Sequence, residues 1–175
     1  LFAIHDITEQ ALEEMNLQMV LSAFKSFSVS IIITDIDALI LWTNPAFTSL
    51  TGYEHEEVIV NNCSILNSGK MEKKYFEEMW RTILSGKVWT GELINRRKDG
   101  NEYHEEETIT PLFDENGKLT RFIAIKQDIS RKKSINEFLL ATIEKEKELN
   151  EMKSRFVSTA SHEFRTPLAS ILITV

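Results

Sequence analysis

The fold of this chain is constrained most strongly by three β-rich segments that follow one another in its second half. They span residues 88–97, 102–113 and 119–129, and two short turns separate them. The turns contain Asp99-Gly100 and Asn116-Gly117. Asp, Asn and Gly accept the positive φ angles that tight hairpins need. This stretch therefore predicts a three-stranded antiparallel meander.

Two shorter β-rich runs and two helical patterns precede the meander. Residues 29–35 and 38–43 form a candidate hairpin. Asn44-Pro45 ends the second run and starts a short helix, because proline is tolerated at the first helical position. A longer helix is predicted over 71–85. Two strands, then helices, then a meander predict an α+β domain with a five-stranded antiparallel sheet and helices on one face. The residues expected on the apolar face of the longer helix are Tyr75, Phe76, Met79, Trp80, Ile83 and Leu84.

Helical patterns flank this domain on both sides. Residues 9–27 carry an apolar stripe, and residues 132–161 carry one that is thin around the charged run 144–148. The first helix either packs on its own domain or forms a parallel coiled coil between two subunits. For the second, a solvated single helix competes with a dimeric coiled coil, which the apolar spacing favours. We therefore expect a homodimer through the flanking helices. The stripes consist of Leu12, Met15 and Met19, and of Ile135, Phe138, Leu149, Met152 and Phe156.

An internal similarity indicates what residues 1–8 are. Like residues 122–130, they read as an apolar strand that ends in Asp-Ile-Thr or Asp-Ile-Ser and precedes a helical pattern. Asp, Ser and Thr suit a helix start because their oxygens accept its free amide hydrogens. We interpret residues 1–8 as the last strand of a preceding domain, with chance similarity as the alternative. Both ends of the chain are expected to be cut from something longer.

Charge and cysteine content argue against several classes of protein. The 175 residues carry a formal net charge of -7, which argues against a surface that binds nucleic acid non-specifically. Cys63 is the single cysteine, so no internal disulfide can form and a reducing, cytoplasmic location is expected. No apolar run approaches the ~20 residues of a membrane span, so no membrane contact is expected here. No metal site is expected at His104-Glu105-Glu106-Glu107, because consecutive strand residues face opposite ways; a solvated strand edge is the preferred interpretation.

Five short motifs stand in the order in which the PAS family of sensor domains carries them. Over residues 28–131 the chain resembles a PAS domain, which implies a PAS fold. The same fold serves many signals, so the resemblance leaves the ligand unknown. Haem is not expected, because the helix over 71–85 contains no histidine to serve as an axial ligand. The motifs are Asn44-Pro45-Ala46-Phe47, Leu50-Thr51-Gly52-Tyr53, Ile65-Leu66-Asn67-Ser68-Gly69, Trp89-Thr90-Gly91-Glu92 and Arg97-Lys98-Asp99-Gly100.

One segment also resembles the flavin-binding LOV domains, PAS relatives in which a cysteine forms a photoadduct. Cys63 lies in a stretch that aligns with that segment, and Asn95 falls where those domains contact the flavin ring. Ser64 and Asn67 depart from the pattern, because they replace an arginine and a glutamine that engage the flavin. The preferred interpretation is a small apolar Cys63 in an ordinary PAS domain, with a blue-light photoreceptor kinase as the alternative.

Two further departures place charges in the expected pocket. Glu105 replaces a second asparagine, and Lys126 replaces a glutamine, on the strands that face the flavin ring. A buried carboxylate needs a partner. If both side chains face inward from adjacent strands, they pair across the pocket and fill it. The alternative is that Lys126 meets an anionic ligand.

The most specific motif lies near the end of the chain, over residues 156–168. It places His162 beside Glu163 on a predicted helix, with Thr166 one turn further on the same face. It resembles the phosphoacceptor box of sensor histidine kinases. The resemblance implies that His162 accepts a phosphoryl group, that Glu163 takes or holds a proton, and that Thr166 orients water for phosphohistidine hydrolysis. Arg165 either supports phosphate charge or contacts solvent.

The kinase resemblance also implies how the chain is organised and what it works with. Residues 132–154 would be a coiled-coil linker, and 155–175 the start of the dimerisation and phosphoacceptor domain. No nucleotide box is present, so Mg-ATP would be bound by a separate domain of the parent protein, and this segment alone is expected to be inactive. The phosphoryl group would pass to an aspartate of a response regulator. A structural PAS dimerisation module with an inert His162 is the alternative from another class.

Pro167 has a physical consequence of its own. Inside a helix, proline removes the hydrogen bond to the carbonyl of Glu163 and crowds it, which costs ~3 kcal/mol unless the helix bends. We expect the bend to lie within one turn of His162, and to be the two-state element that upstream signals bias.

Overall fold

The computed structural model describes residue 15, residues 18–20 and residues 22–173, with side chains as far as Ser161. The chain divides into two compact units, Leu1–Ser130 and Arg131–Val175, which we treat separately. The strand predicted over 1–8 lies outside the described residues. The described residues of the helix predicted over 9–27 are helical apart from Phe27.

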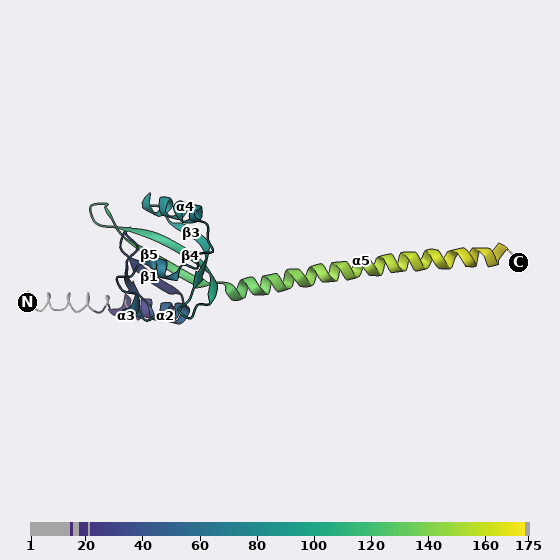
Figure 1. The fold of residues 1–175 in the computed structure, drawn as a ribbon, viewed down its shortest axis with the longest axis horizontal. Helices are drawn as coiled ribbons and strands as arrows, with labels where there is room; N and C mark the ends of the chain where they lie inside the picture. Colours follow the sequence, from purple (N-terminus) through teal and green to yellow (C-terminus); the bar gives the residue numbers. More distant parts are fainter. Residues whose placement is uncertain (1–14, 16–17, 21, 174–175) are drawn as a thin grey trace, which may run out of the picture. The chain divides into compact units, whose positions relative to one another are not determined.

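The first unit is built on a five-stranded sheet (Figure 1). Its strands are β1 (Ser30–Thr34), β2 (Ile40–Thr43), β3 (Trp89–Arg96), β4 (Glu102–Phe113) and β5 (Leu119–Asp128). They lie in the order β2-β1-β5-β4-β3, and all neighbours are antiparallel. The first and last strands of the domain thus pair at the centre of the sheet. The predicted fold class is confirmed.

The hairpin turns form as their sequences predict. Asp99 Oδ1 accepts the Asn101 N–H at 2.9 Å, and Gly100 has a φ of 90°. In the next turn, Asp114 Oδ1 accepts the backbone N–H groups of Asn116 and Lys118. These turns fix the length of each loop, and with it the register of the meander.

Four short helical segments connect β2 to β3. They are α2 (Pro45–Thr51), α3 (His55–Val58), the 3₁₀ helix η1 (Cys63–Leu66) and α4 (Lys73–Leu84). The buried Asn44 caps α2, because its Oδ1 accepts the Phe47 N–H, and it also accepts the Ile31 N–H of β1. This side chain therefore ties the start of α2 to the sheet.

The core lies between the inner face of the sheet and these helices. Trp80 of α4 packs edge-on against Phe122 of β5, with ring centroids 6.0 Å apart. The predicted apolar face of α4 is correct for Met79 and Ile83 but wrong for Leu84, which is 56% exposed. Leu84 is the last residue of the helix, where the core no longer covers it. The buried core residues are Ile32, Ile40, Phe47, Val58, Leu66, Met79, Ile83, Trp89, Leu93, Ile109, Phe122 and Ala124.

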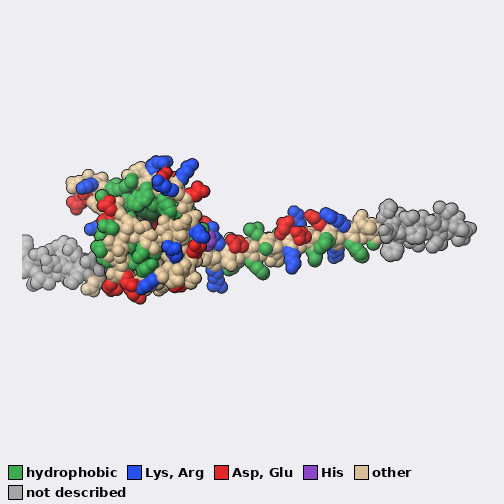
Figure 2. Space-filling model, in the orientation of Figure 1, with side chains coloured by type: hydrophobic (Ala, Val, Ile, Leu, Met, Phe, Trp, Pro, Cys, Tyr) green, Lys and Arg blue, Asp and Glu red, His purple; other side chains and the backbone are tan. Residues whose placement is uncertain are grey.

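The described residues of the second unit belong to one long helix, α5 (Ser130–Ile173, Figure 1), whose first residue is the last of the first unit. It continues without interruption across the boundary predicted between 132–154 and 155–175. Figure 2 shows apolar side chains spaced along it among charged ones. The large apolar side chains of Ile135, Phe138, Leu149, Met152 and Phe156 are 49–74% exposed in the single chain. Among the described residues, no helix is both long and apolar enough to cross a membrane.

Candidate functional site

The first unit encloses a cavity of about 260 Å³ between α4, η1 and the inner face of the sheet. This is just below the ~300–1,000 Å³ usual for pockets that enclose drug-sized ligands, so the cavity suits a compact ligand. Most of its wall is apolar and aromatic. The lining residues are Thr34, Ala38, Asn62, Cys63, Ser64, Asn67, Phe76, Met79, Trp80, Ile83, Leu93, Asn95, Glu107, Ile109, Phe122, Ala124 and Lys126.

Strand alternation and register bring charged side chains to one end of this cavity. Glu105 and Glu107 are two residues apart on β4, so both face the inner side of the sheet. Lys126 of β5 stands directly opposite Glu107 in the register. Asn95 of β3 is also buried and lines the cavity.

These four side chains form one buried polar cluster. Lys126 Nζ lies 2.6 Å from Glu105 Oε1 and 2.8 Å from Glu107 Oε1. Asn95 Nδ2 donates to the same Glu105 oxygen at 2.7 Å. The Glu105–Lys126 pair expected from the sequence is therefore present, but it does not fill the pocket. Sequence reasoning missed Glu107, although its two-residue spacing from Glu105 is a signal that it shares the inner face.

The electrostatics of the cluster reflect its burial. Burial alone would lower the pKa of Lys126, but Glu105 and Glu107 together outweigh it and hold that pKa well above its usual value. Burial raises the pKa of Glu107, although Lys126 opposes this. Glu105 Oε2 and the Tyr103 hydroxyl are buried without a hydrogen-bond partner among the described residues.

Cys63 lines the same cavity as Asn95, so the structure brings together the two residues singled out by the flavin comparison. Burial raises the pKa of the Cys63 thiol to about 12, so it is protonated at neutral pH. No group of three or more metal-ligating side chains occurs among the described residues.

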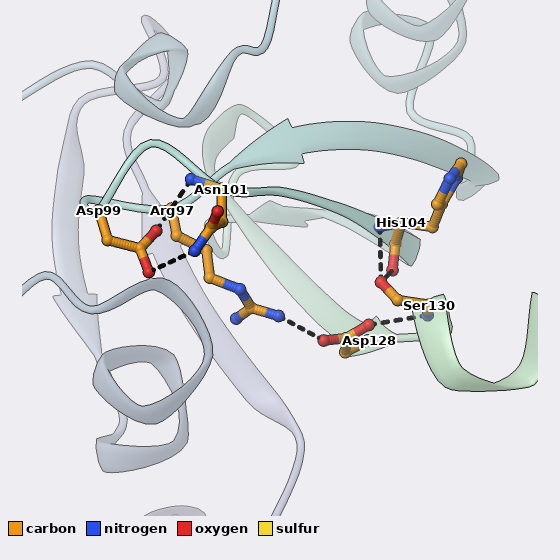
Figure 3. Close-up of polar contacts among 6 residues, drawn as sticks. All are labelled: Arg97, Asp99, Asn101, His104, Asp128 and Ser130. Atoms are coloured by element: carbon orange, nitrogen blue, oxygen red, sulfur yellow. Dashed lines mark hydrogen bonds and ion pairs between the residues drawn. The ribbon is translucent and has the colours of Figure 1, made fainter. Parts of the chain in front are cut away.

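A second polar network lies where β5 leads into α5 (Figure 3). Arg97 Nη2 contacts Asp128 Oδ2 at 2.6 Å, and Asp128 Oδ1 accepts the Ser130 N–H at 2.8 Å. The Ser130 hydroxyl in turn accepts the backbone N–H of His104 at 2.9 Å. Partial burial would raise the pKa of Asp128, but hydrogen bonds from Ser130 and the charge of Arg97 lower it overall. The first residue of α5 is thereby held to β4 and, through Asp128, to Arg97, the residue that follows β3.

The phosphoacceptor motif lies in the second unit. The backbone of α5 is helical from His162 through Pro167, as predicted. The side chains of His162, Glu163, Arg165, Thr166 and Pro167 lie outside the described residues. Their roles, and the bend at Pro167, remain predictions from the sequence.

Comparison with known proteins identifies the first unit. A family model described as a PAS domain matches residues 28–131. The "Nitrogen fixation regulatory protein" of Klebsiella oxytoca is 34% identical over 128 residues, covering 73% of this chain and 26% of that protein. "Phototropin-2" of Oryza sativa is 27% identical over 132 residues. That match covers 74% of this chain and 14% of the relative. The chain thus spans about a quarter, or less, of these relatives.

Solved structures agree with this assignment. An RNA-binding Light-Oxygen-Voltage receptor superposes with a TM-score of 0.66 at 25% identity, covering 73% of this chain and 37% of that chain. The LOV domain of the blue-light activated histidine kinase of Erythrobacter litoralis EL346 superposes with a TM-score of 0.56 at 27% identity. That match covers 59% of this chain and 98% of that chain.

Proposed function

The chain belongs to the PAS domain family, and from this premise we propose that its cavity controls phosphorylation of His162 through helix α5. The domain is the sensory part of a signalling protein. In the proposed parent, a two-component histidine kinase, a nucleotide-binding domain would transfer the γ-phosphoryl group of Mg-ATP to His162. A response-regulator aspartate would then receive it.

One observation carries this proposal: β5 belongs to both polar networks. Lys126 of β5 sits in the cavity cluster, and Asp128, two residues later, anchors the start of α5. A change at Lys126 therefore occurs two residues from Asp128, the side chain that binds the first residue of α5. A ligand that binds more tightly to one arrangement of this strand end than to another would shift the population between them.

The chemistry proposed for His162 follows from its neighbours in sequence. A phosphoacceptor histidine needs a neutral imidazole nitrogen as the nucleophile, with the other ring nitrogen's hydrogen held by an acceptor. The adjacent Glu163 would take or hold that proton, and Thr166 would orient water for the reverse hydrolysis. In transfer from ATP, catalysis would consist mainly of positioning and charge stabilisation.

Dimerisation belongs to the same proposal. The exposed apolar side chains of α5 recur at three- and four-residue intervals on either side of its charged middle. A second copy of α5 would cover them as a parallel coiled coil, with Glu144-Lys145-Glu146-Lys147-Glu148 as a weaker central section. The two His162 residues would then lie on one dimeric helical stem.

The test is direct labelling of the histidine. The chain is incubated with the parent's nucleotide-binding domain and labelled ATP, and phosphohistidine is located by mass spectrometry at neutral or alkaline pH. We expect label on His162, none in His162→Ala, and unchanged labelling in the control His104→Gln. Label on another histidine, or none in the wild-type chain, would leave the structural PAS dimerisation module as the better account.

A flavin-binding photoreceptor is the second candidate, favoured by the shared cavity of Cys63 and Asn95 and by the LOV relatives. The aromatic walls and Asn95 suit a flavin ring, which would supply light absorption. Cys63, protonated at neutral pH, would stand beside it. A yellow colour of the purified chain that blue light bleaches in wild type but not in Cys63→Ala would support this candidate. A colourless protein would exclude it.

A further inference from the structure

The charge of the buried cluster is unbalanced in a way that indicates which ligand the cavity accepts. Glu105 and Glu107 contribute two carboxylates, and Lys126 contributes one ammonium group. The side chains of all three are at most 7% exposed. With both carboxylates ionised, the cluster carries one excess negative charge in a setting that water does not screen.

Glu107 is the member of the cluster that can present this excess negative charge to a ligand. It lines the cavity, whereas Glu105 does not, and its side chain is 7% exposed. The structure gives its carboxylate one partner among the described residues, Lys126 at Oε1. A buried carboxylate accepts several hydrogen bonds, so Glu107 keeps acceptor capacity on the cavity side. Lys126 already contacts two carboxylates, which reduces its capacity to hold an anion.

The aromatic part of the cavity lining favours a flat, positively charged partner as well. Phe76, Trp80 and Phe122 line the cavity, and aromatic faces attract cations in addition to burying apolar surface. The polar lining groups other than the cluster are neutral amides, hydroxyls and the protonated Cys63 thiol.

We propose that the cavity binds a compact planar cation, an amidinium or a protonated nitrogen heterocycle, with its N–H groups donated to Glu107, and that it rejects carboxylates. This rests on the proposed sensor role, because it names the class of signal that the PAS domain receives. It also argues against the alternative raised from the sequence, in which Lys126 binds an anionic ligand, because Glu105 and Glu107 already neutralise the charge of Lys126.

Binding of a cation should displace a proton from the cluster. Burial raises the pKa of Glu107, so this carboxyl keeps its proton to a higher pH than a free carboxyl does, and the proton offsets the excess charge. The titratable groups around Glu107 are Glu105 on the same strand, Lys126 from β5 and Cys63 from η1, with Tyr103 beside Glu105. The pKa values of Lys126, Cys63 and Tyr103 are all raised, which keeps these groups protonated while Glu107 titrates. Affinity for a cation therefore increases as pH rises through the pKa of Glu107.

Three probes of equal shape test the proposal: benzamidinium, benzamide and benzoate, each titrated into the purified chain by calorimetry. We expect benzamidinium to bind at least about tenfold more tightly than benzoate, a difference of about 1.4 kcal/mol. Its binding should release protons, seen as a dependence of the heat on the ionisation enthalpy of the buffer. Glu107→Gln should remove the preference. Glu106→Gln, its exposed neighbour on the other face of β4, should keep it.

Several results would overturn the proposal. Equal binding of the three probes, tighter binding of benzoate, or no binding of benzamidinium at about 10 mM would each exclude a cation site. An intact preference in Glu107→Gln would place the selectivity elsewhere, and a co-purifying flavin in the cavity would replace the proposed ligand. Proton release is measured in the wild-type chain alone. This measurement therefore still tests the proposal if Glu107→Gln misfolds. Calorimetry requires no ATP, so its failure is separate from any failure of His162 labelling.

Discussion

Replacing Lys126 with methionine should expose how strongly the cavity cluster depends on its ammonium group. The substitution keeps the length and apolar character of the side chain but leaves Glu105 and Glu107 buried without their cation. Removing one partner of a buried ion pair costs about 3–5 kcal/mol, because the remaining charge is uncompensated. Against a domain stability of about 5–15 kcal/mol, this is a severe but measurable loss.

The pH dependence of this stability loss is the most specific part of the prediction. The pKa of Glu107 is already raised above its ordinary value of 4.5, and without Lys126 it rises further. The stability linked to this group is fully present below about pH 4.5 and is lost as pH rises through the raised pKa, because the native state holds a proton that the unfolded chain releases. The deficit of Lys126→Met should therefore be larger at about pH 8 than at about pH 5.

Urea unfolding followed by tryptophan fluorescence measures this deficit. Trp80 packs against Phe122 in the same domain, so its emission reports on the core beside the cluster. The control is Lys74→Met on the exposed side of α4, which should change stability by no more than about 0.5 kcal/mol. A loss below about 1 kcal/mol for Lys126→Met at about pH 8, or a loss that does not vary with pH, would refute the reasoning.

Three further predictions concern the junction, the sheet and the helix. Asp128→Asn should weaken the partly exposed Arg97 pair by about 0.2–1 kcal/mol in urea unfolding. The difference from wild type should shrink as pH falls through the lowered pKa of Asp128, because protonation removes the same charge. Gly91→Ala should destabilise by about 1–3 kcal/mol, because a Cβ there would collide with the Tyr75 hydroxyl and the Trp89 ring; an unchanged melting temperature would contradict this. Phe138→Ser should shift the chain toward monomer in sedimentation, whereas the neighbouring Glu137→Ser should not; a monomeric wild-type chain would exclude the proposed coiled coil.

The sheet was predictable because its turns carry their own chemistry. Asp99-Gly100 and Asn116-Gly117 specify hairpins locally, and three hairpin-linked strands leave few arrangements other than a meander. The short α3 and η1 were not predicted individually. Their backbone depends on residues such as Val60, which adopts a positive φ of 58° without being glycine, and tertiary contacts impose such a conformation.

The site was predictable only in part. The resemblance to LOV domains placed Glu105 and Lys126 on the inner face of the sheet. The pairing of Lys126 with Glu107 depends on the β4–β5 register, which the turn between these strands sets. The cluster's buried charge balance emerges only when that register is known. Arg97 and Asp128 are 31 residues apart in the chain, and nothing local to either indicates that they form an ion pair.

The claim that the sensor domain controls His162 is tested most directly by the phosphohistidine level of the full parent protein. The measurement compares wild type with Asp128→Asn, which alters the anchor of α5, and with Asp99→Asn, which alters an exposed hairpin turn of the same domain. The account predicts phosphoryl on His162 in all three, at a changed level in Asp128→Asn alone. Phosphoryl absent from His162, or equal levels in wild type and Asp128→Asn, would contradict it.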